Sequence, residues 1–425
     1  MKKYFYSKSE IVQFKQKSLR YACQKYEYVV LLEPNQFGIT QKSFPCKLIF
    51  ASSCHVPAAT YGFDTFCNEI ADNQYDYFGF MTYSLMHGIE GIAKGSSAAV
   101  SFPDFMFFVP EYEITFDHDG ALLSETLMHQ IELYSAPPHI TPILHHFKPH
   151  FNKNEYVNTV HDIQRQIING NIYEINFCNT WDSPYAVIDP INTFFELMHH
   201  SPMPFAAFLK YKQKYCLCAS PERFLHKNGN NIISQPIKGT SKRGKSQTED
   251  NIIIDKLLAS DKEYSENIMI TDLVRNDLSK IAARGTVTVS ELCKLYTYSS
   301  VHQLITTVSC ICGSEYTFGD IIKAAFPMGS MTGAPKYNAI KLIQHYEKID
   351  RGLFSGSIGY VSGNKDFDFN VVIRSIFYDE EANVLTFSAG SGITAYAHAY
   401  DEWDECITKI QSMIAALGIE ANKLG

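Results

Sequence analysis

Lys238 is the residue whose sequence setting best suits a lysine to chemistry. It lies in the segment from Gln235 to Thr240, which reads QPIKGT and follows an apolar run. Pro236 restricts φ and Gly239 permits unusual backbone angles, so we predict a turn at the end of a strand that fixes the direction of the Lys238 side chain. Three cations follow closely: Lys242, Arg243 and Lys245. Burial or neighbouring cations favour the neutral, nucleophilic amine, whereas the alternative is a solvated basic loop.

Glu222 is a candidate acid for the same cleft. It follows a predicted strand over residues 215–218, and Lys238 follows the next predicted strand along the chain. If these strands pair as a hairpin, both side chains face one cleft. A carboxylic acid and an amine in that arrangement suit a general acid and a nucleophile. The alternative is a loop ion pair between Glu222 and Arg223.

Two predicted helices carry glutamates three residues apart, which places each pair on one helical face. The pairs are Glu263 and Glu266 in a helical stretch over residues 248–281, and Glu402 and Glu405 in a helix over residues 395–417. Brought together, these carboxylates would suit Mg²⁺, which prefers oxygen ligands. Neither pair has the histidine of a di-iron E-x-x-H motif. Two solvated acidic faces are the alternative.

Positive and glycine-rich elements near the C-terminus could bind an anion. Arg374 lies in the apolar run 371–376, expected to be a strand, where an arginine is usually paired with a carboxylate from the protein or from a ligand. The Gly390-Ser391-Gly392 turn comes just before the final helix. Lys409 lies one turn beyond Glu405 on that helix.

Composition and charge exclude several classes of protein. The 425 residues are 45% hydrophobic with a formal net charge of −8, which gives no basic surface for nucleic acid or anionic lipid. No stretch has the length of a membrane span and the N-terminus lacks an apolar signal region, so we expect a cytoplasmic protein. The eleven cysteines are expected to be reduced and packed.

The elements that must position these residues fall mostly after residue 145. Residues 1–135 read as mainly β with helical insertions, and prolines and histidines in residues 135–151 interrupt both patterns. We therefore predict an N-terminal segment, 1–145, and a catalytic domain, 146–425. The doublet His145-His146 has no carboxylate or cysteine at ligand spacing, so a polar linker is expected there.

Six ordered motifs from about Phe151 onward resemble those of the chorismate-utilising enzymes. They are residues 170–176 (GNIYEIN), 220–224 (SPERF), 236–240 (PIKGT), 266–277, 333–336 (GAPK) and the Gly-Ser-Gly turn before the last helix. The resemblance implies an α+β fold of two packed antiparallel sheets flanked by helices, with a cleft between them. The N-terminal segment would complete this unit.

The resemblance also implies a reaction. A lysine at position 238 is typical of family members that make aminodeoxychorismate, and anthranilate synthases carry alanine there. Isochorismate and salicylate synthases have a water-activating lysine at the position of Glu174. Gln303 stands where anthranilate synthases carry a catalytic histidine, and the adjacent His302 should face the other side of its strand.

By resemblance, Mg²⁺ held by Glu266 and Glu405, with Glu263 and Glu402 acting through water, would bind the ring carboxylate of chorismate with help from the backbone of residues 390–392. The other site residues would be Arg374 and Tyr360 on the enolpyruvyl carboxylate, Lys409 beside the anion, Lys238 as nucleophile at C2 and Glu222 as the acid that protonates the 4-hydroxyl. Ammonia from a separate glutamine amidotransferase subunit would then give 4-amino-4-deoxychorismate, for p-aminobenzoate and folate synthesis. The alternatives are an anthranilate synthase large component and an inactive paralogue that only binds an amidotransferase.

Overall fold

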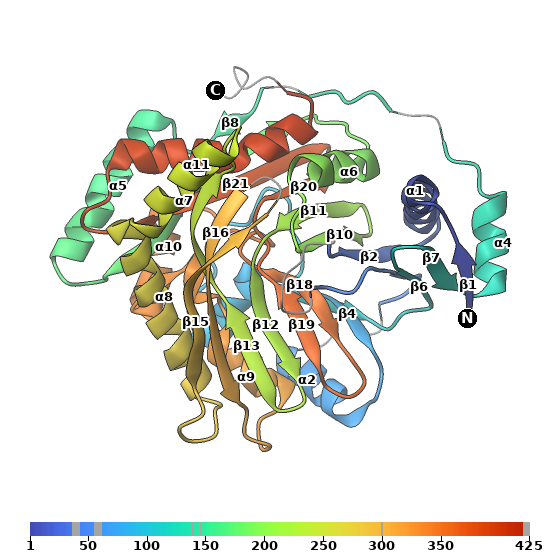
Figure 1. Cartoon of the computed structure of the whole chain (residues 1–425), viewed down its shortest axis with the longest axis horizontal. Helices are drawn as coiled ribbons and strands as arrows, with labels where there is room; N and C mark the ends of the chain where they lie inside the picture. The colour runs from blue at the N-terminus through green and yellow to red at the C-terminus, as the bar shows by residue number, and fades with distance from the viewer. Residues whose placement is uncertain (36–42, 55–61, 138–139, 145, 299–300, 420–425) are drawn as a thin grey trace.

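A computed structural model describes residues 1–35, 43–54, 62–137, 140–144, 146–298 and 301–419. Two antiparallel β-sheets pack against each other, and helices lie around them (Figure 1). The α+β class with two packed sheets, predicted from the sequence, is confirmed. None of the described helices is long and apolar enough to cross a bilayer. All eleven cysteines are free thiols, as predicted.

The larger sheet has twelve strands in antiparallel pairs. Across the sheet the order is β1 (Lys2–Phe5), β7 (Gly120–Leu123), β6 (Tyr112–Phe116), β3 (Lys47–Ala51), β2 (Tyr28–Glu33), β10 (Phe205–Tyr211), β11 (Lys214–Ser220), β20 (Ser375–Asp379), β21 (Val384–Ile393), β9 (Glu174–Pro184) and β17 (Gly333–Ala334). The short strand β8 (Lys148–Pro149) also pairs with β9.

The smaller sheet has nine strands, also in antiparallel pairs. Its order is β14 (Ile237–Lys242), β16 (Val301–Ile311), β13 (Asn231–Gln235), β12 (Arg223–Asn228), β19 (Phe367–Asn370), β18 (Ser357–Val361), β4 (Tyr77–Met81) and β5 (Phe105–Phe108), with β15 (Thr288–Thr297) also paired to β16.

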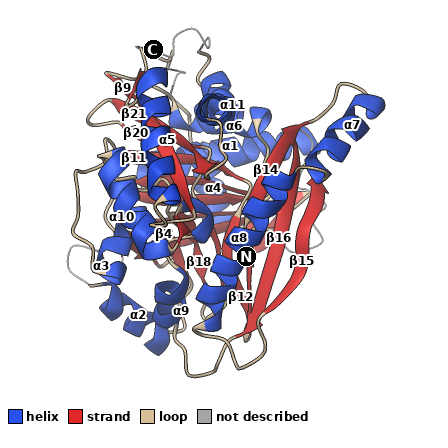
Figure 2. Cartoon of the chain, turned by 90° about the vertical axis from the view of Figure 1, so that its left-hand side faces the viewer, coloured by secondary structure: helices blue, strands red, loops and turns tan. Residues whose placement is uncertain are grey.

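The helices are divided between the two cores of the molecule. The core outside the larger sheet takes side chains from α1 (Lys8–Lys25), α4 (Glu125–Leu133), α5 (Lys153–Ile168), α6 (Pro190–His200), α10 (Lys336–Glu347) and α11 (Ala399–Ala416). The second core fills the space between the sheets and also includes residues on the other face of the smaller sheet, where Phe66 stacks on Phe107. It takes side chains from α2 (Phe63–Asp72), α3 (Met86–Glu90), α8 (Asp261–Ser279) and α9 (Phe318–Ala325), and Ile340 of α10. The helix α7 (Gln247–Leu258) lies near the ends of β14 and β16 (Figure 2).

Strand alternation explains why two cores form. On β2, Val29 and Leu31 face the outer helices, whereas Val30 and Leu32 face the smaller sheet. Successive side chains of a strand point to opposite faces, so an all-apolar strand requires apolar cover on both faces. β2 pairs with β10 and β4 pairs with β18, so the first 145 residues contribute strands to both sheets. The domain boundary at residue 145 stays a prediction.

Two local predictions are corrected by the structure. The helical stretch expected over residues 248–281 is two helices, because Ser260 accepts a hydrogen bond from the Glu263 backbone N–H and caps the start of α8. The apolar run 371–376 is not a continuous strand. Arg374 has a φ of 52°, in the left-handed region, and β20 begins only at Ser375.

Candidate active site

A cavity of about 500 Å³ lies between residues of both sheets and the helices α8 and α11. Nine residues that the sequence assigned to the site line it: Glu222, Lys238, Glu263, Glu266, Arg374, Gly390, Gly392, Glu405 and Lys409. They come from segments up to 187 positions apart in the chain, from Glu222 to Lys409. The fold therefore brings together an acid, an amine, an arginine and a group of carboxylates around one space.

Lys238 lies in a strand, and the prediction of a simple turn is wrong. It belongs to β14, whose register against β16 shifts between Ile237 and Thr240. Gly239 has a φ of 89° at this irregularity, a conformation that glycine adopts without strain. The amide of Asn267 on α8 donates a 2.8 Å hydrogen bond to the carbonyl of Lys238 and so holds the bulged strand against the helix.

Carboxylates, and not cations, surround the Lys238 ammonium. Its Nζ donates a 2.9 Å hydrogen bond to Oε1 of Glu174 and lies 3.7 Å from Oε2 of Glu266. Although burial lowers the pKa of Lys238, the charges of these two carboxylates raise it above its usual value. The expectation that neighbouring cations favour the neutral amine is wrong, since Arg243 is directed to Asp250. Lys238 must lose a proton before it can act as a nucleophile.

Glu222 is buried and has the properties of a proton donor. Burial raises the pKa of its carboxyl to about 7. Ser330, in a short 3₁₀ turn, donates a 2.5 Å hydrogen bond to its Oε1. The loop ion pair with Arg223 does not form, because the Arg223 guanidinium binds Asp368 at 2.9 and 3.0 Å and Gln235 at 2.8 Å.

The two glutamate pairs meet across α8 and α11, with Lys262 among them. The Nζ of Lys262 lies 2.8 Å from Oε1 of Glu402, 3.8 Å from Oε1 of Glu266 and 3.9 Å from Oε2 of Glu405. Figure 2 shows α8 lying along β14 and β16, and Figure 1 shows α11 across β21. Sequence reasoning missed Lys262, although its i,i+4 spacing to Glu266 was visible.

Near these glutamates, three buried carboxylate oxygens have no hydrogen-bond partner among the described residues. They are Oε2 of Glu174, Oε1 of Glu266 and Oε2 of Glu402. Burial raises the pKa of Glu266 to about 7 and also raises the pKa of Glu263. A buried carboxylate without a partner is costly, and oxygen donors of this kind suit a hard divalent cation such as Mg²⁺. The donor set therefore fits the metal that the sequence predicted.

Lys409 and Arg374 supply positive charge on the other sides of the cavity. Lys409 bridges Oε1 of Glu405 at 2.7 Å and the carbonyl of Gly390 at 2.8 Å. Within the described parts of the chain, the guanidinium of Arg374 makes no hydrogen bond or ion pair, and burial lowers its pKa. The protein carboxylate that was the alternative partner for Arg374 is thus not found there. A half-buried arginine without a hydrogen-bond or ion-pair partner is a ready site for an anion.

Three residues assigned to the site do not line the cavity. The Tyr360 ring stacks on Phe78, with ring centroids 5.7 Å apart. The Ser391 hydroxyl shares a 3.1 Å hydrogen bond with Tyr156, on the side away from the cavity. Glu402 is 1% exposed and reaches Lys262 behind the lining. Their roles in binding stay predictions.

His302 and Gln303 face opposite sides of β16, as predicted. Gln303 lines the cavity, whereas Nε2 of His302 lies 2.8 Å from Asp250 and its Nδ1 lies 2.9 Å from the Thr297 hydroxyl. The histidine is therefore part of a buried polar network outside the cavity.

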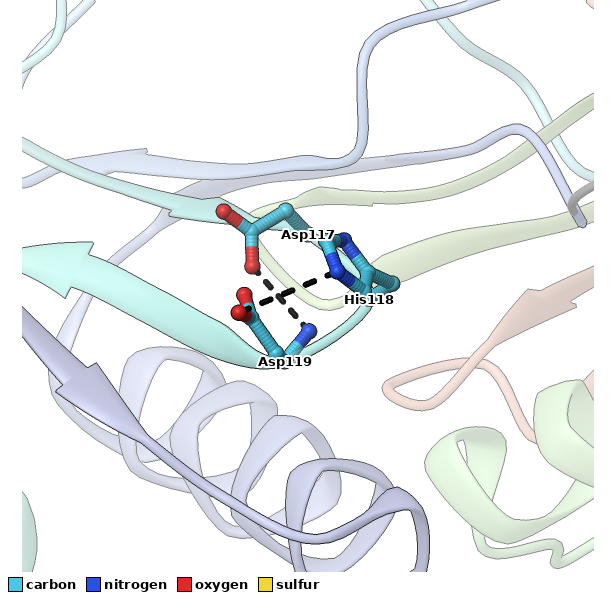
Figure 3. A group of neighbouring side chains, drawn as sticks. All are labelled: Asp117, His118 and Asp119. Atoms are coloured by element: carbon cyan, nitrogen blue, oxygen red, sulfur yellow. Dashed lines mark hydrogen bonds and ion pairs between the residues drawn. The ribbon is translucent and has the colours of Figure 1, made fainter.

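Within the described parts of the chain, the one group of at least three metal-ligating side chains that lie close together is in the turn between β6 and β7 (Figure 3). Oxygen or nitrogen atoms of Asp117, His118 and Asp119 lie within 4.8 Å of one another. Lys3 lies 2.7 Å from both aspartates and neutralises part of their charge. Because the turn is largely exposed and already paired with a lysine, we assign no metal site to it.

The chain belongs to the family of chorismate binding enzymes, whose sequence profile matches residues 46–415. Aminodeoxychorismate synthase of Arabidopsis thaliana is 37% identical over 270 residues, which are 63% of this chain and 29% of that protein. The chain thus spans less than a third of that relative. Aminodeoxychorismate synthase component 1 of Escherichia coli is 29% identical over 359 residues, covering 82% of this chain and 78% of the relative.

Anthranilate synthase component 1 of Saccharolobus solfataricus is equally similar, with 29% identity over 347 residues and 80% of each chain covered. Two solved structures share the fold. Anthranilate synthase component I of Streptococcus pneumoniae superimposes with a TM-score of 0.72, 23% identity and 92% of each chain covered. The menaquinone-specific isochorismate synthase of Escherichia coli gives a TM-score of 0.76, 15% identity and coverage of 98% and 94%.

Proposed function

We propose that this chain is the chorismate-converting component of an aminodeoxychorismate synthase. It would join chorismate and ammonia to give 4-amino-4-deoxychorismate and water. The observation that carries the proposal is that Lys238 and the proton donor Glu222 line the same cavity. A nucleophile and an acid on one substrate divide a difficult substitution into two easier steps.

In the first step Lys238 gives a proton to Glu174, whose Oε1 already accepts its hydrogen bond. The free amine attacks C2 of the ring, both ring double bonds shift, and the C4–O bond breaks as Glu222 protonates the leaving hydroxyl. In the second step ammonia attacks C4, the double bonds shift back, and the bond between C2 and Lys238 breaks. Glu222 takes a proton from the new amino group, and Lys238 recovers its proton from Glu174.

The glutamates of α8 and α11 are the proposed holders of Mg²⁺, with Glu263, Glu266 and Glu405 lining the cavity and Glu402 behind them. When bound, Mg²⁺ would neutralise the ring carboxylate of chorismate. The Arg374 guanidinium is the proposed partner of the enolpyruvyl carboxylate, because it lines the cavity and makes no hydrogen bond or ion pair among the described residues.

The proposed source of ammonia is a separate glutamine amidotransferase subunit. The name "component 1" of the Escherichia coli relative supports a second component for this enzyme. We further propose that the protein acts in the cytoplasm, in the synthesis of p-aminobenzoate and folate. We propose that Tyr360 and Ser391 act indirectly. Tyr360 would act through its ring, which stacks on Phe78, and Ser391 through the position of the backbone at Gly390 and Gly392.

Product identity tests the proposal. The purified protein is incubated with chorismate, Mg²⁺ and an ammonium salt, with and without an added aminodeoxychorismate lyase. We expect a product that becomes p-aminobenzoate only when the lyase is present, and no product from Lys238→Ala. Anthranilate with pyruvate, formed without the lyase, would instead identify an anthranilate synthase, the second candidate given the Saccharolobus relative.

A further inference from the structure

Lys262 occupies the place between the glutamates where a bound cation would interact with them. Its ammonium is within 4 Å of carboxylates from both helices: Glu266 on α8, and Glu402 and Glu405 on α11. The nearest of these oxygens, Oε1 of Glu402, is 2.8 Å away. This lysine is thus a protein-supplied counter-ion for three of the four proposed metal ligands.

Burial differs sharply between Lys262 and two of its three partners, whereas the side chain of Glu405 is 39% exposed. The side chain of Glu402 is 1% exposed and that of Glu266 is 7% exposed, whereas that of Lys262 is 41% exposed. The carboxylates of Glu266 and Glu402 are therefore largely withdrawn from water, but the lysine can turn toward solvent without disturbing the core. A long lysine side chain keeps such freedom because its four-carbon stem is flexible.

Even with Lys262 in place, two of these glutamates each keep one carboxylate oxygen that accepts no hydrogen bond from the described residues. Oε2 of Glu402 and Oε1 of Glu266 are buried without a hydrogen bond. An ammonium offers three directed donors on a single charge, whereas a divalent cation carries twice the charge and binds several carboxylate oxygens at once.

We propose that Lys262 is a resident cation that gives way to the divalent metal, so that this lysine sets the affinity of the site for Mg²⁺. The inference rests on the proposed magnesium site and adds a residue that controls it. Metal binding would be an exchange of one cation for another. The ammonium would move toward solvent, and the orphaned oxygens of Glu266 and Glu402 would gain a ligand.

The test measures metal affinity on the full chain without chorismate. Isothermal calorimetry gives Kd for Mg²⁺, and electron paramagnetic resonance of free Mn²⁺ gives Kd for that ion. We expect Lys262→Met to tighten both by about tenfold or more, because a competitor for the same carboxylates is removed. Lys262→Arg, which keeps the charge, should not tighten them.

Lys409→Met is the matched control for charge alone. Lys409 touches Glu405 at 2.7 Å but has no ion pair with Glu266 or Glu402 among the described residues, so its removal should tighten Kd much less than that of Lys262. Melting temperatures give a second readout. With a chelator, Lys262→Met should melt below the wild type, and Mg²⁺ should raise its melting temperature more than that of the wild type.

An unchanged or weaker Kd in Lys262→Met, or equal tightening in Lys409→Met, would overturn the proposal. So would a failure of both ions to bind either protein. The product assay is separate from these measurements. A product other than 4-amino-4-deoxychorismate would overturn the proposed function and leave the cation exchange standing, whereas an unchanged Kd would remove only the role of Lys262.

Discussion

Lys238 of the smaller sheet and Glu174 of the larger sheet form an ion pair, with 2.9 Å between Nζ and Oε1. Both side chains are largely withdrawn from water, at 10% and 1% exposure. The pair therefore joins the two sheets at the cavity and also places the proposed nucleophile beside a proton acceptor. The same ion pair therefore stabilises the packing of the sheets and prepares Lys238 for the proposed reaction.

Removing the lysine of this pair should destabilise the protein. Lys238→Met leaves buried Glu174 without its counter-ion and leaves Glu266 with Lys262 alone, which costs about 3 kcal/mol of unfolding free energy. The double variant Lys238→Met/Glu174→Gln should recover part of that loss, because one of the two charges is also removed. Urea unfolding of both variants and the wild type measures the difference. A double variant less stable than Lys238→Met would contradict the account.

Glu222→Gln should slow the formation of the covalent adduct by about 100-fold or more, because the leaving hydroxyl loses its acid. Stopped single-turnover reactions without ammonia measure this step. In the wild type only protonated Glu222 donates, and burial raises its pKa to about 7. The rate should therefore fall as pH rises through about 7. A variant rate equal to that of the wild type would exclude Glu222 as the acid.

Ser330→Ala should move this pH dependence in a predictable direction. The serine hydroxyl donates a hydrogen bond to the Glu222 carboxylate and so lowers its pKa. Without that bond the pKa rises, and the decline in rate should shift to higher pH. The same single-turnover profile measures the shift. A shift to lower pH would show that the Ser330 hydrogen bond does not lower the pKa of Glu222.

Arg374→Met should separate substrate binding from stability. The half-buried guanidinium makes no hydrogen bond or ion pair among the described residues, so its loss removes an uncompensated charge and should leave the melting temperature unchanged or higher. Affinity for chorismate should fall by about 30-fold, which corresponds to about 2 kcal/mol for a charged hydrogen-bonded pair. Calorimetry with chorismate measures this affinity. An unchanged affinity would show that the enolpyruvyl carboxylate does not bind Arg374.

Much of the fold could be predicted from the sequence because local signals were strong. The strand expected over residues 215–218 lies within β11, and the helix expected over residues 395–417 is observed as α11, with nearly the same bounds. The ordered motifs predicted the paired sheets. The break between α7 and α8 was missed, since an apolar pattern continues across Ser260 and only the cap marks the end.

The charge environment of the site could not be predicted in the same way. Cations adjacent to Lys238 in sequence suggested a depressed lysine pKa, but the contacts that decide it come from Glu174 and Glu266, 64 and 28 positions away. Tyr360 was placed by motif position, yet its ring packs on Phe78. Such contacts depend on how the sheets and helices meet, which spacing along one strand does not determine.

The most direct test is the mass of Lys238 after reaction with chorismate in the presence of Mg²⁺ and the absence of ammonia. The protein is quenched in acid, digested, and its peptides are analysed by mass spectrometry. We predict that the peptide containing Lys238 gains the mass of chorismate less one water, and that ammonia added before the quench removes the gain. An unmodified Lys238 under conditions where 4-amino-4-deoxychorismate is formed would contradict the proposed role of this lysine.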